Sequence, residues 1–433
     1  MPLTGAGNRF IGGAKGHPDM RFSPYIILFI VAAAAGLFFA GFSTHDFVEH
    51  LDRQVHSIHC SFIPGLDNPD ASGASGCHVT MMSPYSSVFR GTLWGGLPVS
   101  LPAMSVFAFL LFRGVDLLVN RGSQERGPRI FLVAAAALPV LTSLVFGYLS
   151  LVELDAACKL CIGIYSSSLV CFIAALLELR AASQPGLGSE FGILGEDRAS
   201  ENGDLRDYGL SFGQGVGFVA IPALVYVIAM PDYAGYTGTC GALAKPEDPY
   251  NMMVALGPQG AGAEAIEVFD PLCPACKGFE TRLESSGLED QMSRRAVMFP
   301  LDNTCNWMVS SAVHPGACTV SEAVLCAEPG KADAVVDWAF ENQTAIREAA
   351  KADPAAAGAM VLARFPEMKS CLGGAAVKSK LNKSLRWAVA NQLAVLTPQL
   401  YVNGVKLCDE DTDLGMEYAL SRLLENQAKG GSQ

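Results

Sequence analysis

Charged side chains are scarce in this chain. Only 17% of its 433 residues are Asp, Glu, Lys or Arg, and half of the residues are hydrophobic. The formal net charge is −12, so the chain lacks the basic surface that nucleic-acid binding requires, and we predict no nucleic-acid partner. Long apolar runs fill roughly the first 230 residues, and most of the charge follows them. This distribution predicts a membrane region followed by a soluble region.

Two kinds of cofactor motif are also missing. No GxGxxG motif is followed by a suitable βαβ unit, which argues against a bound dinucleotide. Zinc is the usual alternative for paired CxxC motifs, but no Cys/His spacing here resembles a zinc finger. The two CxxC pairs also lie more than a hundred residues apart. We therefore predict no metal site.

The apolar runs predict five membrane-spanning helices. We interpret the first run as an uncleaved helix, since it continues well past the small residues 32–35 that a signal peptidase would favour. Pro98 and Pro102 are expected to kink the second helix. The five helices are expected over roughly residues 24–43, 92–112, 130–150, 158–180 and 212–230.

Residues 45–59 carry apolar side chains at helical spacing and predict a short amphipathic helix on the membrane surface. A metal site is one interpretation of its histidines. A polar face at the membrane interface is the interpretation that we favour. The four histidines are His45, His50, His56 and His59.

The distribution of Lys and Arg predicts the orientation of the membrane region. With five spans, the N-terminus, the loop of residues 113–129 and the stretch of residues 180–207 share one side of the membrane. That side carries ten basic residues and the opposite side three, so it is expected to be cytoplasmic. The ten are Arg9, Lys15, Arg21, Arg113, Arg121, Arg126, Arg129, Arg180, Arg198 and Arg206; the three are Arg53, Arg90 and Lys159.

Two cysteine pairs carry the chemistry that the sequence suggests. Cys158 and Cys161 open an apolar run, and Cys273 and Cys276 open an amphipathic helix in the soluble region. Two cysteines three positions apart share one helix face, a spacing that permits a disulfide or joint metal ligation. A helix N-terminus lowers the pKa of a thiol, so one cysteine of such a pair can be a thiolate at neutral pH. The first pair would lie at the edge of a bilayer.

The region from about residue 263 shows the alternation of an α/β domain. Strands are expected over 265–269, 296–301 and 397–402, and 405–408 is expected to pair with the last of these through the turn Asn403-Gly404. Residues 307–393 are Ala-rich and predict helices, and residues 414–424 predict a closing helix.

Residues 20–180 resemble the vitamin K epoxide reductase family in its bacterial form. The matching features are a four-span core, the loop cysteines Cys60 and Cys77, the outward CxxC and Tyr165 four residues after Cys161. The resemblance implies a quinone, ubiquinone or menaquinone, as electron acceptor. A dithiol at a bilayer edge also needs an acceptor that dissolves in the membrane.

The resemblance and the depth of each residue suggest roles around the quinone. Cys161 lies about a turn deeper than Cys158, so Cys161 is expected to face the quinone while Cys158 exchanges with the loop. Tyr165, one turn deeper again, is a candidate to hydrogen-bond a quinone carbonyl, with packing between helices as the alternative. Ser86 corresponds to the quinone-contacting entrance of the second helix, with ordinary helix capping as the alternative.

Residues 263–428 resemble thioredoxin-fold disulfide oxidoreductases of the DsbA-like kind. The matching features are Cys273-Pro274-Ala275-Cys276, a helical insertion and Thr397-Pro398 before a strand. The resemblance implies that Cys273 is the exposed nucleophile and Cys276 the resolving thiol. It also implies a cis Pro398 whose backbone pairs with substrate.

The two resemblances together divide the chain and its cysteines. Pairing 60 with 77, 158 with 161 and 273 with 276 leaves seven of the thirteen cysteines. Cys171 lies in the middle of a span and is expected to be inert. The last six can form three bridges in 15 ways, and the sequence does not choose among them. They are Cys240, Cys305, Cys318, Cys326, Cys371 and Cys408.

The expected architecture is an α-helical membrane bundle, with a four-helix core and a fifth linking span, followed by an α/β thioredoxin-like domain with a helical insertion. The expected parts are a cytoplasmic N-terminus (1–23), the vitamin K epoxide reductase-like domain (24–180), a cytoplasmic linker (181–211), the fifth span (212–230), a linker (231–262) and the thioredoxin-like domain (263–433).

The predicted function is that of a quinone-dependent thiol oxidase in a bacterial inner membrane, with the thioredoxin-like domain on the extracytoplasmic side. Electrons would pass from reduced exported proteins through the CPAC pair, the loop cysteines and the membrane CxxC to quinone. One alternative is an outward reductant or isomerase system, although no cysteine lies in the inner loops to receive electrons. Others are a quinone or vitamin K epoxide reductase and a non-enzymatic thiol-binding chaperone.

Overall fold

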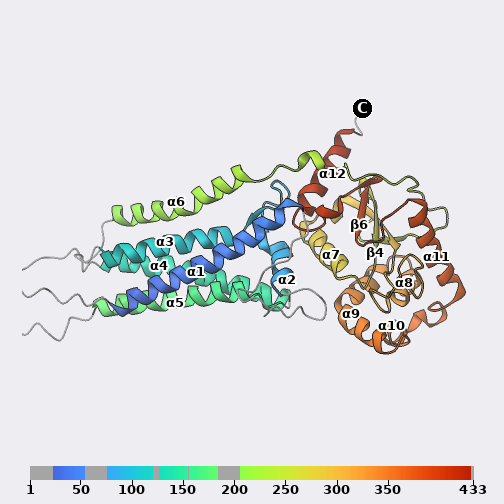
Figure 1. Cartoon of the computed structure of the whole chain (residues 1–433), viewed down its shortest axis with the longest axis horizontal. Coiled ribbons are helices and arrows are strands. Elements are labelled where there is room, and N and C mark those ends of the chain that lie inside the picture. The colour runs from blue at the N-terminus through green and yellow to red at the C-terminus, as the bar shows by residue number, and fades with distance from the viewer. Residues whose placement is uncertain (1–22, 54–75, 120–125, 155, 184–204, 431–433) are drawn as a thin grey trace, which may run out of the picture.

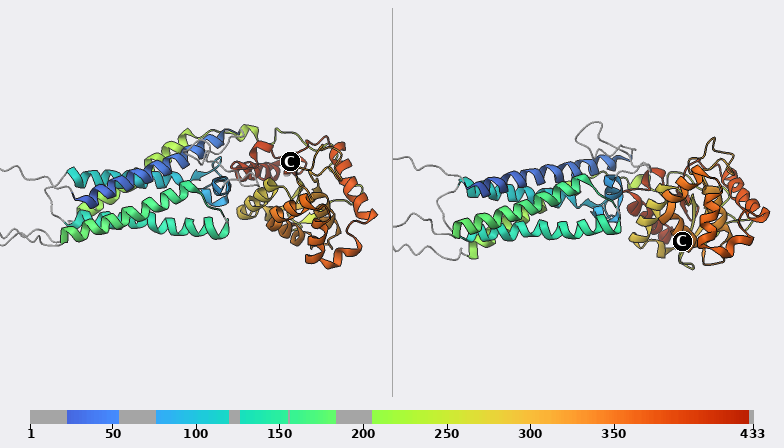
Figure 2. Two further views of the ribbon diagram at one scale, coloured as in Figure 1. Left: turned by 60° about the horizontal axis from the view of Figure 1, so that its bottom comes forward. Right: turned by 90° about the horizontal axis from the view of Figure 1, so that it is seen from below.

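The structure, a computed structural model, describes residues 23–53, 76–119, 126–154, 156–183 and 205–430. Cys60, His56, His59, most of the loop that follows the first span and most of the stretch 181–211 lie outside these residues. The described chain forms two domains that lie end to end in every view, a helical bundle and a domain built on a sheet (Figure 1, Figure 2).

Five of the described helices are long and apolar enough to cross a membrane, as predicted. The first packs against α3 and α5, with Phe29, Phe107 and Cys171 in the shared core. Gly36 permits this contact, because the Phe107 ring occupies the space that a side chain at position 36 would need. The last long helix, α6, lies along α3 outside the four-helix core (Figure 1). The five are α1 (Pro24–Glu49), α3 (Ser100–Val119), α4 (Arg126–Tyr148), α5 (Lys159–Ser183) and α6 (Leu205–Ala229).

The second span begins later than the sequence predicts. Residues 92–99 are not helical, because β1 (Ser87–Val88) pairs with β2 (Leu97–Pro98) in a small antiparallel hairpin. Pro98 therefore precedes the helix, and Pro102 lies in the first turn of α3, where its missing N–H has no intrahelical partner to lose. The prediction that these prolines kink the span is wrong.

The predicted surface helix of residues 45–59 is described only over residues 45–53, and these residues fold differently from the prediction. Residues 45–49 continue α1, and η1 (His50–Asp52) follows directly. His50 is buried rather than part of a polar face, and its Nδ1 hydrogen-bonds the carbonyl of Asp46 at 2.6 Å.

The second domain is organised around a five-stranded sheet in the order β3-β5-β4-β6-β7. Strands β4 and β5 are parallel and are joined through α7 (Pro274–Ser286), and every other neighbouring pair is antiparallel. The β6–β7 hairpin is confirmed, and its turn residues Asn403 and Gly404 both have the positive φ that such a turn requires. The strands are β3 (Val254–Leu256), β4 (Ala263–Phe269), β5 (Met292–Met298), β6 (Gln399–Val402) and β7 (Val405–Lys406).

Helices cover both faces of this sheet because successive residues of each strand point to opposite sides. On one face α7 and α12 pack against Ala265 and Val402, and on the other α11 packs against Val268 and Val297. The predicted helical insertion forms a third cluster with the end of the sheet. The helices are α8 (Ala317–Cys326), α9 (Ala332–Ala352), α10 (Ala356–Arg364), α11 (Ala375–Ala390) and α12 (Met416–Gly430); the short ones are α2 (Gly76–Met82), η2 (Pro84–Ser86), η3 (Leu149–Glu153), η4 (Ala234–Tyr236), η5 (Glu289–Gln291), η6 (Pro366–Ser370) and η7 (Asp409–Asp411).

The stretch 231–262, expected to be a linker, is part of the second domain. It supplies the edge strand β3, and Ala242 bridges to Val405 at the opposite edge of the sheet. Three disulfides select one of the fifteen possible patterns for the six remaining cysteines. The bonds are Cys240–Cys408, Cys305–Cys318 and Cys326–Cys371.

The two domains are docked through a polar and aromatic interface. Arg53, just beyond α1, binds Asp411 at 2.7 Å, and Trp94 packs edge-on against Tyr418. From α7, the half-buried Arg282 donates hydrogen bonds to the carbonyls of Met82 and Thr412, at 3.4 and 2.7 Å. The helix that carries the CPAC pair is thereby attached to the end of α2.

Candidate redox site

The membrane dithiol lies where α5 begins. Cys158 directly precedes the helix, and its Sγ accepts a hydrogen bond from the backbone N–H of Cys161 at 3.3 Å. The connection from α4 is held by Ser150, whose hydroxyl donates to the Ala156 carbonyl at 2.6 Å while the Ala156 N–H donates back to the Ser150 carbonyl. The two sulfurs are therefore presented by a fixed turn at the end of the bundle.

Cys77 lies against this dithiol. It is carried by α2 and packs with Cys158 and Leu160 in a small buried cluster, with Cys161 at its edge. The approach is close because Gly76 has no side chain: a Cβ there would collide with the Ala157 carbonyl. Cys77 is disulfide-bonded, and Cys60, its predicted partner, lies outside the described residues. The structure thus brings together three of the four cysteines predicted to act in the membrane region.

A cavity of about 460 Å³ opens beside these cysteines. Its walls come from α1, α2, α3, α4 and α5, and most of its surface is apolar. Polar side chains on several of these helices also contribute to the wall. Its lining includes Asp46, Cys77, Thr80, Cys158, Cys161 and Tyr165.

Tyr165 and Ser86 both line the cavity, but their hydroxyls differ in availability. Tyr165 lies one turn beyond Cys161 on α5, and no backbone carbonyl of the described residues takes up its hydroxyl. The Ser86 hydroxyl donates to the Met81 carbonyl at 2.5 Å and accepts from Arg90 at 2.8 Å. A serine has one proton to donate, so Ser86 has none left for a cavity ligand in this arrangement.

Two cavity residues were missed by the sequence analysis. Thr80 lies one turn after Cys77 on α2, and its hydroxyl donates toward the carbonyls of Gly76 and Cys77, at 3.0 and 3.1 Å. Asp46 is a carboxylate near the end of the first span, and it is 4% exposed. An acidic residue that continues an apolar span is a recognisable signal of a functional site, and this one could have been found.

The second dithiol occupies the N-terminus of α7, as predicted. Cys273 is the N-cap residue, and its N–H donates to the Asp270 carbonyl at 3.0 Å. A hydrogen bond from the Cys276 thiol, with a further one from Thr397, lowers the pKa of Cys273 to about 6. Burial, and the hydrogen bond that it gives to Cys273, raise the pKa of Cys276. Cys273 is thus the thiolate and Cys276 the thiol of the reduced pair.

The expectation that Cys273 is exposed is wrong. The residue is 5% exposed and Cys276 is fully buried. The insertion helix α9 covers the backbone here, where the Gln343 amide donates to the carbonyls of Pro271 and Cys273 at 3.2 and 2.9 Å. This side of the Cys273 backbone is therefore covered by the insertion.

The Thr397–Pro398 peptide bond is cis. The Cys273 thiol lies 3.6 Å from the Thr397 carbonyl, so the segment before β6 adjoins the reactive sulfur. The expected cis peptide bond before Pro398 and its position beside Cys273 are therefore confirmed. The role of Pro398 in pairing with substrate stays a prediction.

Two vicinal dithiols on one chain, one beside an apolar cavity in a helical bundle and one at a helix N-terminus of an α/β domain, define a thiol–disulfide oxidoreductase. Residues 27–176 match the family model "Vitamin K epoxide reductase family". The chain joins this segment to an α/β domain that carries the CPAC pair at a helix N-terminus beside a cis proline.

Solved structures resemble part of the chain. A protein-disulfide isomerase from Novosphingobium aromaticivorans is 17% identical, with 36% of this chain and 89% of that chain covered and a TM-score of 0.28. A thioredoxin-like oxidoreductase from Silicibacter pomeroyi is 14% identical, with 42% and 94% covered and a TM-score of 0.27. BdbD from Bacillus subtilis is 15% identical, with 44% and 97% covered and a TM-score of 0.25. A search of curated proteins finds no match to this chain.

Proposed function

We propose that this protein is a quinone-dependent thiol oxidase that forms disulfides in exported proteins. The observation that carries the proposal is the apolar cavity of about 460 Å³ whose polar wall holds Cys158, Cys161 and Tyr165. Its volume suits a ring-sized ligand, and apolar walls with few polar groups are typical of sites that bind such ligands.

The proposed electron path uses both dithiols. A substrate thiolate attacks the Cys273–Cys276 disulfide at Cys273, and the second substrate thiol then displaces Cys273, so the substrate leaves oxidised and the CPAC pair reduced. The Cys273 thiolate next reduces the disulfide of the loop cysteines, Cys60 and Cys77. That pair in turn reduces Cys158–Cys161, which Cys77 contacts in the structure. Each exchange moves two electrons and conserves the number of S–S bonds.

The final step transfers two electrons and two protons from the Cys158–Cys161 dithiol to a quinone substrate. The cavity residues fit this substrate in three ways: apolar walls for the ring, the Tyr165 hydroxyl for a carbonyl oxygen and the Asp46 carboxyl as a group that can hold a proton. Cys161 would face the quinone and Cys158 would exchange with Cys77.

The proposed location follows from charge and chemistry together. The excess of Lys and Arg in the N-terminal, 113–129 and 180–207 segments supports a cytoplasmic position for them. The redox cysteines would then face the extracytoplasmic side of a bacterial inner membrane, where disulfides persist. The partners would be the lipid bilayer, a membrane quinone and reduced exported proteins.

The test is quinone reduction by the purified chain supplied with a reduced, unfolded protein. Wild-type protein should reduce quinone and oxidise the substrate in equal amounts, while Cys161→Ala should reduce no quinone and oxidise no more substrate than its remaining disulfides allow. Cys171→Ala is the matched control, because Cys171 lies on the same helix, is buried in the bundle and does not line the cavity. Quinone reduction by Cys161→Ala, or equal loss in Cys171→Ala, would contradict the proposal.

A further inference from the structure

A buried carboxylate and a buried imidazole lie behind the CPAC pair, and the proposed electron path does not use them. Asp270 is fully buried, and its Oδ2 lies 2.7 Å from Nδ1 of His314. The His314 side chain is only 8% exposed. A buried charge is costly unless it is paired and hydrogen-bonded, so this arrangement favours the ion pair over a lone carboxylate.

The fold places Asp270 directly against the reactive cysteines. It follows β4 directly, three positions before Cys273, whose N–H binds the Asp270 carbonyl. Its carboxylate also accepts the N–H groups of Leu272 and Leu301, each at 2.8 Å. These bonds hold the carboxylate in position behind the sulfurs.

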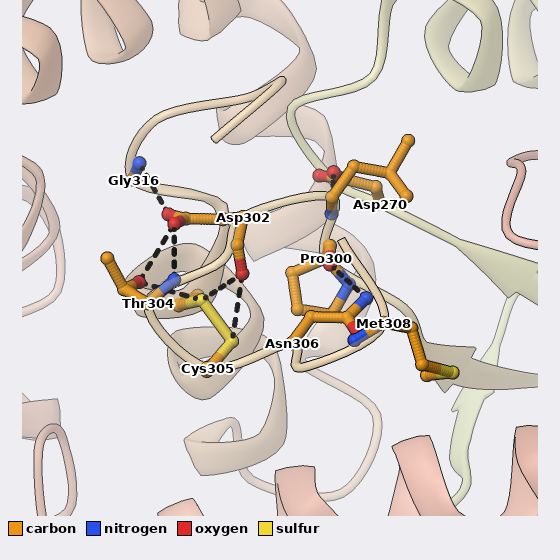
Figure 3. Close-up of a disulfide and its surroundings, with 10 residues drawn as sticks. Asp270, Pro300, Asp302, Thr304, Cys305, Asn306, Met308 and Gly316 are labelled. Atoms are coloured by element: carbon orange, nitrogen blue, oxygen red, sulfur yellow. Dashed lines mark hydrogen bonds between the residues drawn. A yellow bond between two sulfur atoms is a disulfide. The ribbon is translucent and has the colours of Figure 1, made fainter. Parts of the chain in front are cut away.

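A separate loop holds His314 in place. The loop is closed by the Cys305–Cys318 disulfide, and Asp302 caps it by accepting hydrogen bonds from Thr304 and Gly316 (Figure 3). The N–H groups of Val313 and His314 both donate to the Leu301 carbonyl, at 2.9 and 3.0 Å. The histidine is therefore anchored to the same residue whose N–H binds Asp270.

Charge links this pair to the thiols. The Asp270 carboxylate acts to raise the pKa of both Cys273 and Cys276, because like charges repel. Burial acts to lower the pKa of His314, but the hydrogen bond and charge of Asp270, with the charge of Cys273, raise it overall. Arg347 on α9 opposes this rise through its own positive charge. These are the charged groups that act on His314 most strongly.

We propose that His314 is a positioning residue: its imidazolium, held by Asp270, balances the carboxylate beside Cys273 and so stabilises the reduced, thiolate form of the CPAC pair. Stabilising the reduced form makes a dithiol a stronger oxidant. The same coupling is reciprocal, so forming the Cys273–Cys276 disulfide removes the thiolate and weakens proton binding at His314. Oxidation then releases the Cys276 proton together with a fraction of the His314 proton. The proposal rests on the CPAC pair being an exchange centre, as in the proposed function.

The test measures the pH dependence of Cys273 alkylation in the full reduced chain, located by peptide mass mapping, and uses no quinone. His314→Gln leaves the Asp270 charge unbalanced, so the midpoint should rise by about one pH unit, a roughly tenfold slower reaction below the midpoint. Asp270→Asn/His314→Gln removes both charges and should return the midpoint close to the wild-type value. A midpoint that stays raised in the double variant, or that is unchanged in His314→Gln, would overturn the proposal.

A second measurement decides the matter if a variant does not fold. The His314 ring titration in histidine-labelled wild-type protein, followed by NMR, should show a higher pKa in the reduced than in the oxidised chain. Equal His314 pKa values in the two redox states would contradict the proposal. A loss of quinone reduction with this pKa difference intact would instead count against the proposed function alone.

Discussion

At the scale of single residues, the reduced CPAC pair holds one proton, which stays on Cys276 and leaves Cys273 as a thiolate. Cys276 keeps its proton because it is fully buried, and the hydrogen bond that it donates lowers the pKa of Cys273 to about 6. The nucleophile is therefore charged at neutral pH, where an ordinary thiol is not.

The low pKa of Cys273 predicts how the stability of the reduced protein depends on pH. This pKa is lower in the folded than in the unfolded chain, so its contribution is fully present above the ordinary thiol value of 9.0 and is lost as pH falls through about 6. Chemical unfolding of the reduced chain between pH 5 and 9 should show stability rising by a few kcal/mol, since a tenfold change in proton affinity corresponds to about 1.4 kcal/mol. Cys273→Ser should lose this rise, and the account of Cys273 fails if that variant keeps it.

A second residue prediction concerns Tyr165. Tyr165→Phe should raise the apparent quinone KM roughly fivefold, because a hydrogen bond contributes about 1 kcal/mol. Tyr148→Phe is the control, since Tyr148 is exposed on α4 and does not line the cavity. Unchanged quinone kinetics in Tyr165→Phe would assign the residue to helix packing.

At the scale of elements, local patterns in the sequence predict what local physics decides. The CxxC helix starts, the Asn403-Gly404 turn and the five apolar spans of the described residues follow from neighbouring residues and are present as expected, although the bounds of the spans differ. The start of α3 was predicted too early, because residues 92–99 are apolar enough to belong to a span. In the structure, residues 97–98 pair with Ser87 and Val88 in a hairpin, and the helix begins after them.

Partners that are distant in the sequence could not be predicted. Residues 254–256 form an edge strand only because β5 is available to pair with them. Likewise, a family resemblance predicted that Cys77 acts with the membrane dithiol. Its contact with Cys158, however, depends on the close approach of Gly76 to the Ala157 carbonyl, which the sequence does not indicate. Nothing in the composition of α7 indicates that Arg282 would bind Met82, which lies 200 positions earlier.

Arg282 gives a prediction at this scale. Arg282→Met should leave the carbonyls of Met82 and Thr412 without their donor and weaken the docking of α7 on α2, at a cost of about 1–3 kcal/mol. Hydrogen exchange should quicken in α2, and electron transfer between the domains should slow several-fold, while thiol exchange at the isolated CPAC step is unchanged. Arg386→Met is the control, because Arg386 is exposed on α11. Identical hydrogen exchange in both variants would show that Arg282 does not hold the interface.

At the scale of the whole molecule, the two domains share one axis, with the membrane dithiol at the end of the bundle that meets the soluble domain (Figure 2). This arrangement is useful for electron transfer only if that end of the bundle and the soluble domain face the compartment in which substrates fold. The distribution of Lys and Arg supports this orientation.

Reporter fusions test the orientation directly. A reporter after Gly122 should be cytoplasmic, and a reporter after Gln433 should be exported, because basic loops are retained in the cytoplasm. A cytoplasmic reporter at the C-terminus would reverse the orientation and remove the basis for oxidation of exported proteins.

The central claim is that electrons pass from the CPAC pair to the membrane dithiol through the loop cysteines. The direct measurement is the rate of quinone reduction from a reduced, unfolded substrate by wild-type protein and by Cys60→Ala/Cys77→Ala. We expect the double variant to lose the reaction almost completely while its CPAC pair still oxidises substrate once. Electron transfer to quinone at the wild-type rate in Cys60→Ala/Cys77→Ala would show that the loop cysteines form a structural bond and that the relay is wrong.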